Sequence, residues 1–286
     1  MVDPKGPTVS WRFDAVTPSL LSQLKEIWQF RDLFPALFLR SLFLIRQKAI
    51  LGIFWVVVRV VAIALPVAFL VGQVLKFDTD QLPPSIFILS GFAAWMLFRE
   101  CAMYMMKALA LHKLLVERFN IPPLLLIASI TSVGLFAFVI VNLIMLVPIV
   151  YHWLTTGTMV IAFGPNLLAA VPTALMILLL ALGVSCFTAI FGYVLADTIL
   201  AMRYIFTAWM LASPVFYSPG MFDSKYRFWF YLNPLAGPIE TYRWSLFRTQ
   251  DPDWANIALS FAIGIAVLLA GMTFFLKLQR RFLDFD

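Results

Sequence analysis

The sequence predicts an all-α membrane protein with six transmembrane helices, an amphipathic interface helix before them and a re-entrant hairpin before the last. Of the 286 residues, 62% are hydrophobic and 13% are charged, whereas a soluble domain carries about 25% charged residues. The apolar residues form long blocks, and a block of about 20 crosses a bilayer. The Lys and Arg residues lie between these blocks, which suits headgroup contact and orientation rather than nucleic-acid binding.

Residues 1–48 are predicted to form a cytoplasmic leader, separate from a membrane domain over residues 49–286. Thr17 is a suitable helix cap and Pro18 a suitable first helical residue. Apolar residues then recur at helical spacing with charges on the other faces, which predicts a helix lying along the membrane surface. No apolar signal-peptide core precedes it, so we expect the first span to act as an uncleaved insertion signal.

The membrane domain divides into six apolar spans and one irregular stretch. The spans are expected at about residues 49–75, 85–110, 124–150, 166–192, 199–217 and 255–276. The irregular stretch, residues 218–254, is rich in aromatic residues and broken by three prolines. It is too polar to span and too apolar for a free loop. Paired re-entrant or interfacial helices fit it, because irregular backbone at membrane depth needs protein or a water-filled cavity around it.

The distribution of Lys and Arg predicts the orientation. The leader carries seven, the first outer connection carries one, and the next outer connection carries none. Since positive residues concentrate on the cytoplasmic side, both termini are expected to be cytoplasmic. Residues 218–254 carry four and depart from the rule, but loop charge describes membrane-embedded hairpins poorly, so the even span count is kept.

The chain lacks the motifs of several catalytic classes. It has no GxxxxGK[ST] phosphate-binding loop. Its only histidines, His112 and His152, belong to connections on opposite sides of the membrane, so they are not expected to share a metal or triad site. Cys101 and Cys186 lie inside apolar spans, as buried small side chains do. We expect no enzymatic activity, no cofactor and no metal in this chain.

Charges inside the predicted spans are the first functional signal. Arg59 and Arg99 are each about 15 Å from the cytoplasmic end of their spans at 1.5 Å per residue, and Glu100 follows Arg99. Arg59 is therefore expected to reach Glu100 across neighbouring antiparallel spans. A structural salt bridge and a polar conduit that contacts an anionic substrate both stay open. In the second case one arginine pairs with Glu100 and the other faces the conduit.

Aromatic residues are the second signal, at 16% of the chain. Belts at the two membrane interfaces account for most of them. Trp95, Phe98 and Tyr104, however, lie in the second predicted span near the charges. With Arg59, Arg99 and Glu100 they are the candidate conduit residues, because sugar rings stack on aromatic faces.

Four short stretches follow one another in order along the chain. They are Arg46-Gln47-Lys48 with Leu51-Gly52-Ile53-Phe54-Trp55, Ser90-Gly91-Phe92-Ala93-Ala94-Trp95, Ala212-Ser213-Pro214-Val215-Phe216-Tyr217, and Leu232-Asn233-Pro234-Leu235 with Glu240 and Arg243-Trp244. Together they resemble the permease subunits of type-2 ATP-binding-cassette exporters for cell-surface polysaccharides, over about residues 35–280. The chain departs from the family pattern at Val60, where proline is usual, and at Ala196, where arginine is frequent.

The resemblance implies a larger machine in the bacterial inner membrane. Two copies of the chain would form a conduit for a lipid-linked polysaccharide, with O-antigen of lipopolysaccharide ahead of capsule or teichoic acid. Two copies of a separate cytoplasmic ATPase would bind ATP and Mg. The leader would dock on this ATPase together with the coupling residues Leu114, Leu115, Glu117, Arg118 and Phe119. A solvated connection is the plain alternative for that segment.

The hairpin before the last span would close the outer side of the conduit. The candidate gate residues are Asn233, Pro234, Glu240, Arg243 and Trp244. Glu240 and Arg243 are three residues apart, so they share a helix face and are expected to pair.

Other functions remain open from the sequence. An ion-coupled secondary transporter would call for repeated halves with broken helices, and the chain shows no internal repeat. A membrane-embedded glycosyltransferase would need a carboxylate base or a metal site at the membrane surface, for which Asp78 and Asp80 are the candidates. A small-molecule exporter of the same superfamily is a further alternative.

Overall fold

The structure is a computed structural model, and it describes residues 31–46, 54–111, 123–194, 196–249 and 252–283. All regular structure in these ranges is helical. The α-helices are α2 (Phe34–Arg46), α3 (Phe54–Phe69), α4 (Pro84–Leu111), α6 (Pro123–Thr156), α7 (Ala170–Val194), α8 (Ala196–Ala212), α9 (Ser224–Tyr231), α10 (Ala236–Phe247) and α11 (Trp254–Leu283). A π-helical segment, Leu70–Leu75, continues α3. The all-α prediction is confirmed for the described residues.

Five of the described helical segments are long and apolar enough to cross a membrane. They are Val57–Leu75, Pro84–Met106, Val133–Thr156, Pro165–Gly192 and Trp254–Leu278. Each one corresponds to a predicted span, so the chain is a multi-pass helical membrane protein.

The predicted fifth span, residues 199–217, is not among these five segments and is not confirmed. It corresponds to α8, which has 17 residues and is about 26 Å long, somewhat short of a bilayer core of about 30 Å. The helix ends at Ala212 because Pro214 lacks a backbone donor and disfavours helical backbone at the residue before it.

α4 is the central helix of the bundle. Its candidate span is 94% buried, whereas the other four candidate spans are between 22% and 39% buried. Its neighbours are α3, α6, α7, α8 and α10, and α11 packs on the other side of α7. The α7–α11 contact depends on two glycines, because a Cβ on Gly271 would overlap the backbone oxygen of Gly183. Such close approach of backbones is typical of helix pairs in membranes.

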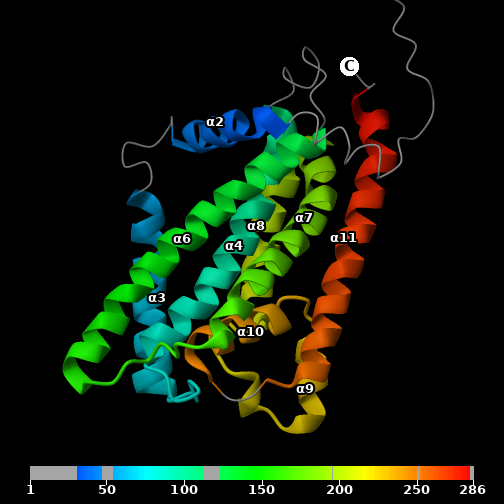
Figure 1. Ribbon diagram of the computed structural model, residues 1–286. Coiled ribbons are helices and arrows are strands. Elements are labelled where there is room, and N and C mark those ends of the chain that lie inside the picture. The colour runs from blue at the N-terminus through cyan, green and yellow to red at the C-terminus, as the bar shows by residue number, and fades with distance from the viewer. Residues whose placement is uncertain (1–30, 47–53, 112–122, 195, 250–251, 284–286) are drawn as a thin grey trace, which may run out of the picture.

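The two ends of the bundle differ. At one end, α2 lies across the start of α6, and the chain also leaves α11 at this end (Figure 1). At the other end lie α9 and α10, which occupy the predicted hairpin of residues 218–254 (Figure 1). Neither short helix is long enough to cross a bilayer, since α10 has 12 residues and is about 18 Å long. We refer to these as the α2 end and the α10 end.

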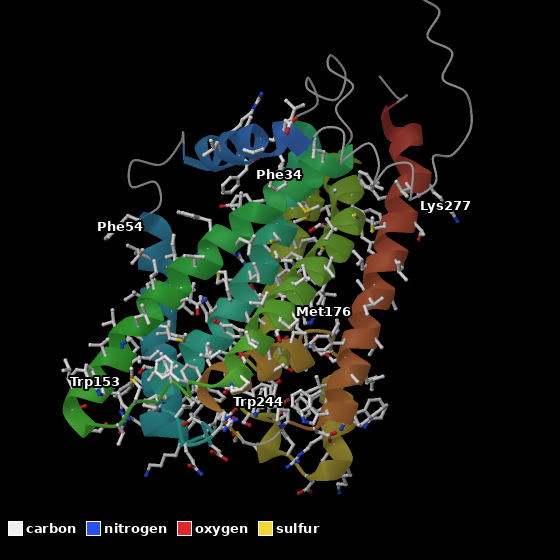
Figure 2. All side chains as sticks on the ribbon, in the orientation of Figure 1. Phe34, Phe54, Trp153, Met176, Trp244 and Lys277 are labelled. Carbon is white, nitrogen blue, oxygen red and sulfur yellow. The ribbon has the colours of Figure 1, made fainter. Side chains whose placement is uncertain are left out.

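Aromatic side chains mark the α10 end. Trp153 at the end of α6 and Trp244 on α10 both lie toward it, whereas Phe54 and Lys277 lie toward the α2 end (Figure 2). Trp153 is 48% exposed, which suits a ring at a membrane interface. The predicted interface helix that begins at Thr17 falls largely outside the described residues.

Candidate functional site

Charged side chains from three helices meet inside the bundle. Arg59 of α3, Arg99 and Glu100 of α4, and Arg203 of α8 line one pocket, together with Met103 and Tyr104. The pocket has a volume of about 320 Å³. We call it the arginine pocket.

Glu100 holds two of the three arginines. Its Oε1 accepts hydrogen bonds from Nη2 of Arg59 at 3.0 Å and from Nη1 of Arg99 at 2.7 Å. The Glu100 side chain is only 5% exposed, whereas Arg59 and Arg99 are 37% and 22% exposed. The predicted contact between Arg59 and Glu100 is confirmed. The expectation that only one arginine would pair is wrong, because both side chains reach the same carboxylate oxygen.

The arginine pocket carries an excess of positive charge. Three guanidinium groups and one carboxylate give a net charge of +2. An arginine inside a membrane span is costly, up to about 2.5–3.5 kcal/mol at the helix centre on insertion scales, so this excess calls for an anion. Nε of Arg59 is also buried and has no hydrogen-bond partner among the described residues.

The pocket lies in the half of the bundle nearer the α2 end. Arg59 is five residues from the described start of α3 and Arg203 is seven from the start of α8, or about 8 and 10 Å along the helix axis. Arg99 is twelve residues, or about 18 Å, from the end of α4. The three side chains line one pocket, so they meet at one level of the bundle although the helix ends lie at different distances from it.

Arg203 is the functional candidate that the sequence analysis missed. It lies inside the predicted span 199–217, so the signal that singled out Arg59 and Arg99, a charge within a span, also applies to it. Its side chain is exposed in the structure, which makes it accessible to a ligand in the pocket.

Tyr104 lines the arginine pocket, whereas Trp95 and Phe98 do not. These two side chains are fully buried. Phe98 lies edge-on to Phe206 and Trp209 of α8, at ring-centroid distances of 5.8 and 5.0 Å. Their visible role is to pack α4 against α8. A sugar ring has no access to either face in this arrangement, so their role in a conduit stays a prediction.

A second polar cluster joins the hairpin to the bundle at the α10 end. Asn233 Oδ1 accepts a hydrogen bond from Nε1 of Trp209 at 3.0 Å, and its Nδ2 donates to Oγ of Ser213 at 2.8 Å. Ser260 of α11 donates to the backbone oxygen of Asn233 at 2.8 Å. Asn233 therefore links α8, the turn before α10, and α11.

Arg243 is the centre of this cluster and is 1% exposed. Its Nε donates to Oγ of Ser90 at 3.2 Å, and its Nη2 donates to the backbone oxygens of Phe87 and Pro214 at 3.3 Å and of Val215 at 3.4 Å. The guanidinium carbon also lies 3.7 Å from the centroid of the Phe87 ring, a cation–π contact. We refer to Asn233, Arg243 and these partners as the hairpin cluster.

The other gate candidates differ in their contacts from the prediction. Within the described residues Glu240 and Arg243 form no ion pair. Glu240 instead accepts a hydrogen bond from the Tyr231 hydroxyl, so the predicted pairing is wrong. The two residues share α10, but Arg243 extends to α4 and the turn after α8, while Glu240 contacts α9. Pro234 is buried, and Trp244 lies edge-on to Trp254 at 5.2 Å.

Burial shifts the pKa of both charged residues of α10. It raises the pKa of Glu240, an effect that the Tyr231 hydrogen bond and the charge of Arg243 partly offset. Burial also lowers the pKa of Arg243 to about 10, which leaves the guanidinium protonated at neutral pH.

Two further predictions concern other parts of the chain. The coupling residues Leu114, Leu115, Glu117, Arg118 and Phe119 lie outside the described residues. In the α3–α4 connection, Oδ1 of Asp78 accepts a hydrogen bond from the backbone N of Asp80 at 2.9 Å, which shapes the turn. Among the described residues no group of three or more His, Cys, Asp or Glu side chains is placed to hold a metal ion.

Comparison with protein-family models finds no match for this chain, and comparison with curated proteins finds none either. Within the described residues, the charged and polar side chains reported above gather in the arginine pocket toward the α2 end and in the hairpin cluster at the α10 end.

Proposed function

We propose that this chain is the membrane-spanning permease subunit of an ATP-driven exporter of a lipid-linked cell-surface polysaccharide, of the O-antigen class. The observation that carries the proposal is the meeting of three of the four family-like stretches at the hairpin cluster. Ser90 from the second stretch and Pro214 from the third both accept hydrogen bonds from Arg243 of the fourth. Chance similarities would be scattered through the fold, whereas these residues form one set of contacts.

Gly91 adds a steric argument to the same observation. A Cβ at this position would lie 2.7 Å from Nη2 of Arg243 and 2.8 Å from the backbone oxygen of Val215. The second stretch therefore requires glycine at position 91, because Arg243 of the fourth stretch and the backbone of Val215 in the third stretch approach this position closely. The motif residues fit one another sterically as well as by hydrogen bonding, which supports the resemblance as a structural unit.

In this proposal two copies of the chain form the conduit, and two copies of a separate cytoplasmic ATPase bind ATP and Mg and supply the energy. The exporter lies in the bacterial inner membrane, with both termini and the α2 end cytoplasmic. The α10 end is then the outer side, where the hairpin with Asn233, Pro234, Glu240, Arg243 and Trp244 closes the conduit. The leader and residues 114–119 contact the ATPase.

The proposed direction of transport agrees with the position of the arginine pocket. A lipid-linked polysaccharide starts on the cytoplasmic side and carries its negative charge at the junction between lipid and sugar. Positive charge in the cytoplasmic half of the bundle attracts that junction. The hairpin cluster then lies ahead of the sugar chain on the outer side. Because Arg243 is held by neutral oxygens and a ring, opening the hairpin there separates no ion pair.

Deletion of the gene tests the proposal. We expect the cell surface to lose its polysaccharide while the lipid-linked polysaccharide accumulates inside, and we expect the parent gene to restore both. The chain purified from its own membranes in mild detergent should carry an ATPase and have no ATP hydrolysis once that subunit is removed. An unchanged cell surface after deletion contradicts the proposal. Anion uptake by the chain alone, driven by an ion gradient, would identify a secondary transporter instead.

A further inference from the structure

We propose that the arginine pocket binds a diphosphate group, the headgroup of a lipid-linked diphosphate, with Arg203 as its third cation. The inference deepens the proposed function and rests on it for the identity of the lipid. Free pyrophosphate contains the same diphosphate group as the lipid headgroup, and the experiment below distinguishes these two ligands.

The charge of the pocket selects the class of anion. Arg59, Arg99 and Arg203 contribute three positive charges and Glu100 one negative charge. A diphosphate diester carries two negative charges and neutralises the net charge of +2 that remains in the pocket. The phosphodiester of an ordinary phospholipid carries one and leaves an uncompensated positive charge, which is costly at membrane depth. The pocket therefore favours a diphosphate over a bulk phospholipid headgroup.

The donors around the pocket match the acceptor atoms of a diphosphate. Each guanidinium group offers five N–H donors in a planar fork, which suits phosphate oxygens in pairs. Arg59 uses Nη2 and Arg99 uses Nη1 to hold Glu100, which leaves other nitrogens of both groups for a second acceptor. Nε of Arg59 is one of these, because it is buried and has no partner among the described residues.

The pocket has the size and accessibility that such a ligand needs. Its volume of about 320 Å³ lies at the lower end of the range of about 300–1,000 Å³ for small-molecule sites, which admits a headgroup but excludes a folded sugar chain. Arg59 keeps 37% of its side chain exposed, and Arg203 is exposed as well. The lipid tail and the sugar therefore extend outside the pocket, with only the charged junction inside.

Glu100 acts in this site as an internal counter-ion. Its single oxygen Oε1 holds Arg59 and Arg99 together and keeps the cations in place when no ligand is bound. It also competes with the ligand for both guanidinium groups. Removing its charge should therefore strengthen diphosphate binding, whereas a purely structural ion pair predicts no gain in binding from the same change.

Binding to the full-length chain in phosphatidylcholine nanodiscs, in phosphate-free buffer, tests the inference. The probe is farnesyl diphosphate, with the phosphodiester farnesyl methyl phosphate, farnesol and inorganic pyrophosphate as comparisons. We expect farnesyl diphosphate to bind most tightly. The variant Arg203→Gln should weaken it at least tenfold and Arg203→Lys should recover part of that loss. The variant Arg248→Gln removes the same charge at the α10 end and should change binding less than twofold.

Glu100→Gln gives a second, opposite result. We expect it to bind farnesyl diphosphate severalfold more tightly than the parent, provided that it elutes as the same species on size exclusion. The inference is overturned if Arg203→Gln binds like Arg248→Gln, or if farnesol binds as tightly as the diphosphate. Equal binding of inorganic pyrophosphate and farnesyl diphosphate assigns the pocket to a soluble anion and overturns the lipid headgroup.

The inference and the proposed function fail in different ways. If Arg203→Gln loses diphosphate binding but deletion of the gene leaves the surface polysaccharide intact, the site stands and the export function falls. If deletion removes the surface polysaccharide but Arg203→Gln binds farnesyl diphosphate like the parent, export stands and the headgroup site is wrong.

Discussion

Replacing Arg243 with methionine should weaken the attachment of the hairpin to the bundle. The guanidinium is 1% exposed and holds Ser90 on α4 and the backbone oxygens of Pro214 and Val215 in the turn after α8. Methionine fills much of the same space but donates no hydrogen bond. The change therefore removes the polar contacts of Arg243 without opening a large cavity.

The expected cost follows from the acceptors that are left behind. Among the hydrogen bonds of the described residues, the oxygens of Pro214 and Val215 have no donor other than Arg243. Two orphaned buried carbonyls cost about 1–3 kcal/mol each, and loss of the Phe87 contact adds about 1 kcal/mol. Relief from burying a charge offsets part of this sum. We expect a net loss of about 2–4 kcal/mol in the free energy of unfolding.

Equilibrium unfolding of the purified protein in mixed micelles of mild detergent and dodecyl sulfate measures this loss, with tryptophan fluorescence as the signal. Arg248→Met is the matched control, because Arg248 lies at the end of the same helix and is exposed. It should change the free energy by less than about 0.5 kcal/mol. An Arg243→Met variant as stable as the parent would refute the reasoning. The cost of burying the guanidinium charge would then cancel the free energy gained from its hydrogen bonds and its ring contact.

Three further predictions concern packing, pH and coupling. Gly271→Ala should lower thermal stability more than Gly264→Ala. A Cβ at residue 271 would overlap the backbone of α7, whereas a Cβ at residue 264 would meet only the flexible end of a methionine side chain. Equal losses of thermal stability would refute this. Burial raises the pKa of Glu240 above its ordinary value of 4.5. The contribution of this carboxyl group to stability is therefore full below that value and is lost as pH rises through the folded pKa. Glu240→Gln should thus match the parent near pH 4 and exceed its thermal stability at pH 8, and parallel profiles would contradict this. Replacing Glu117 and Arg118 with alanine should cut export at least tenfold at unchanged thermal stability, and unchanged export would rule out coupling through them.

Much of the helix arrangement was predictable from local pattern. The predicted second span, 85–110, differs from α4 by one residue at each end, because Pro84 suits the first helical position and the apolar run is continuous. The last helix extends beyond the predicted 255–276 to Leu283, since a helix continues past the membrane where the residues favour it. Length and hydropathy identified the spans, but Pro214 shortened α8 below the predicted fifth span.

The polar sites were only partly predictable. The contact between Arg59 and Glu100 followed from two charges at similar depth on antiparallel neighbours. Arg203 joined them because α8 packs against α4, and that neighbour relation depends on tertiary structure. The partners of Arg243 were not readable from sequence, because most are backbone oxygens, which every residue carries. The expected pair with Glu240 did not form, because Arg243 extends to oxygens on other elements and Glu240 accepts a hydrogen bond from Tyr231 of α9.

Reconstitution tests the account most directly. The chain and the ATPase that purifies with it would be placed in proteoliposomes that carry the lipid-linked polysaccharide on the face where the ATPase lies. The account predicts that ATP hydrolysis moves the polysaccharide to the opposite face and that vesicles without the ATPase move none. Equal movement without the ATPase, or ATP hydrolysis that never moves the polysaccharide, would contradict the proposed role as an export permease.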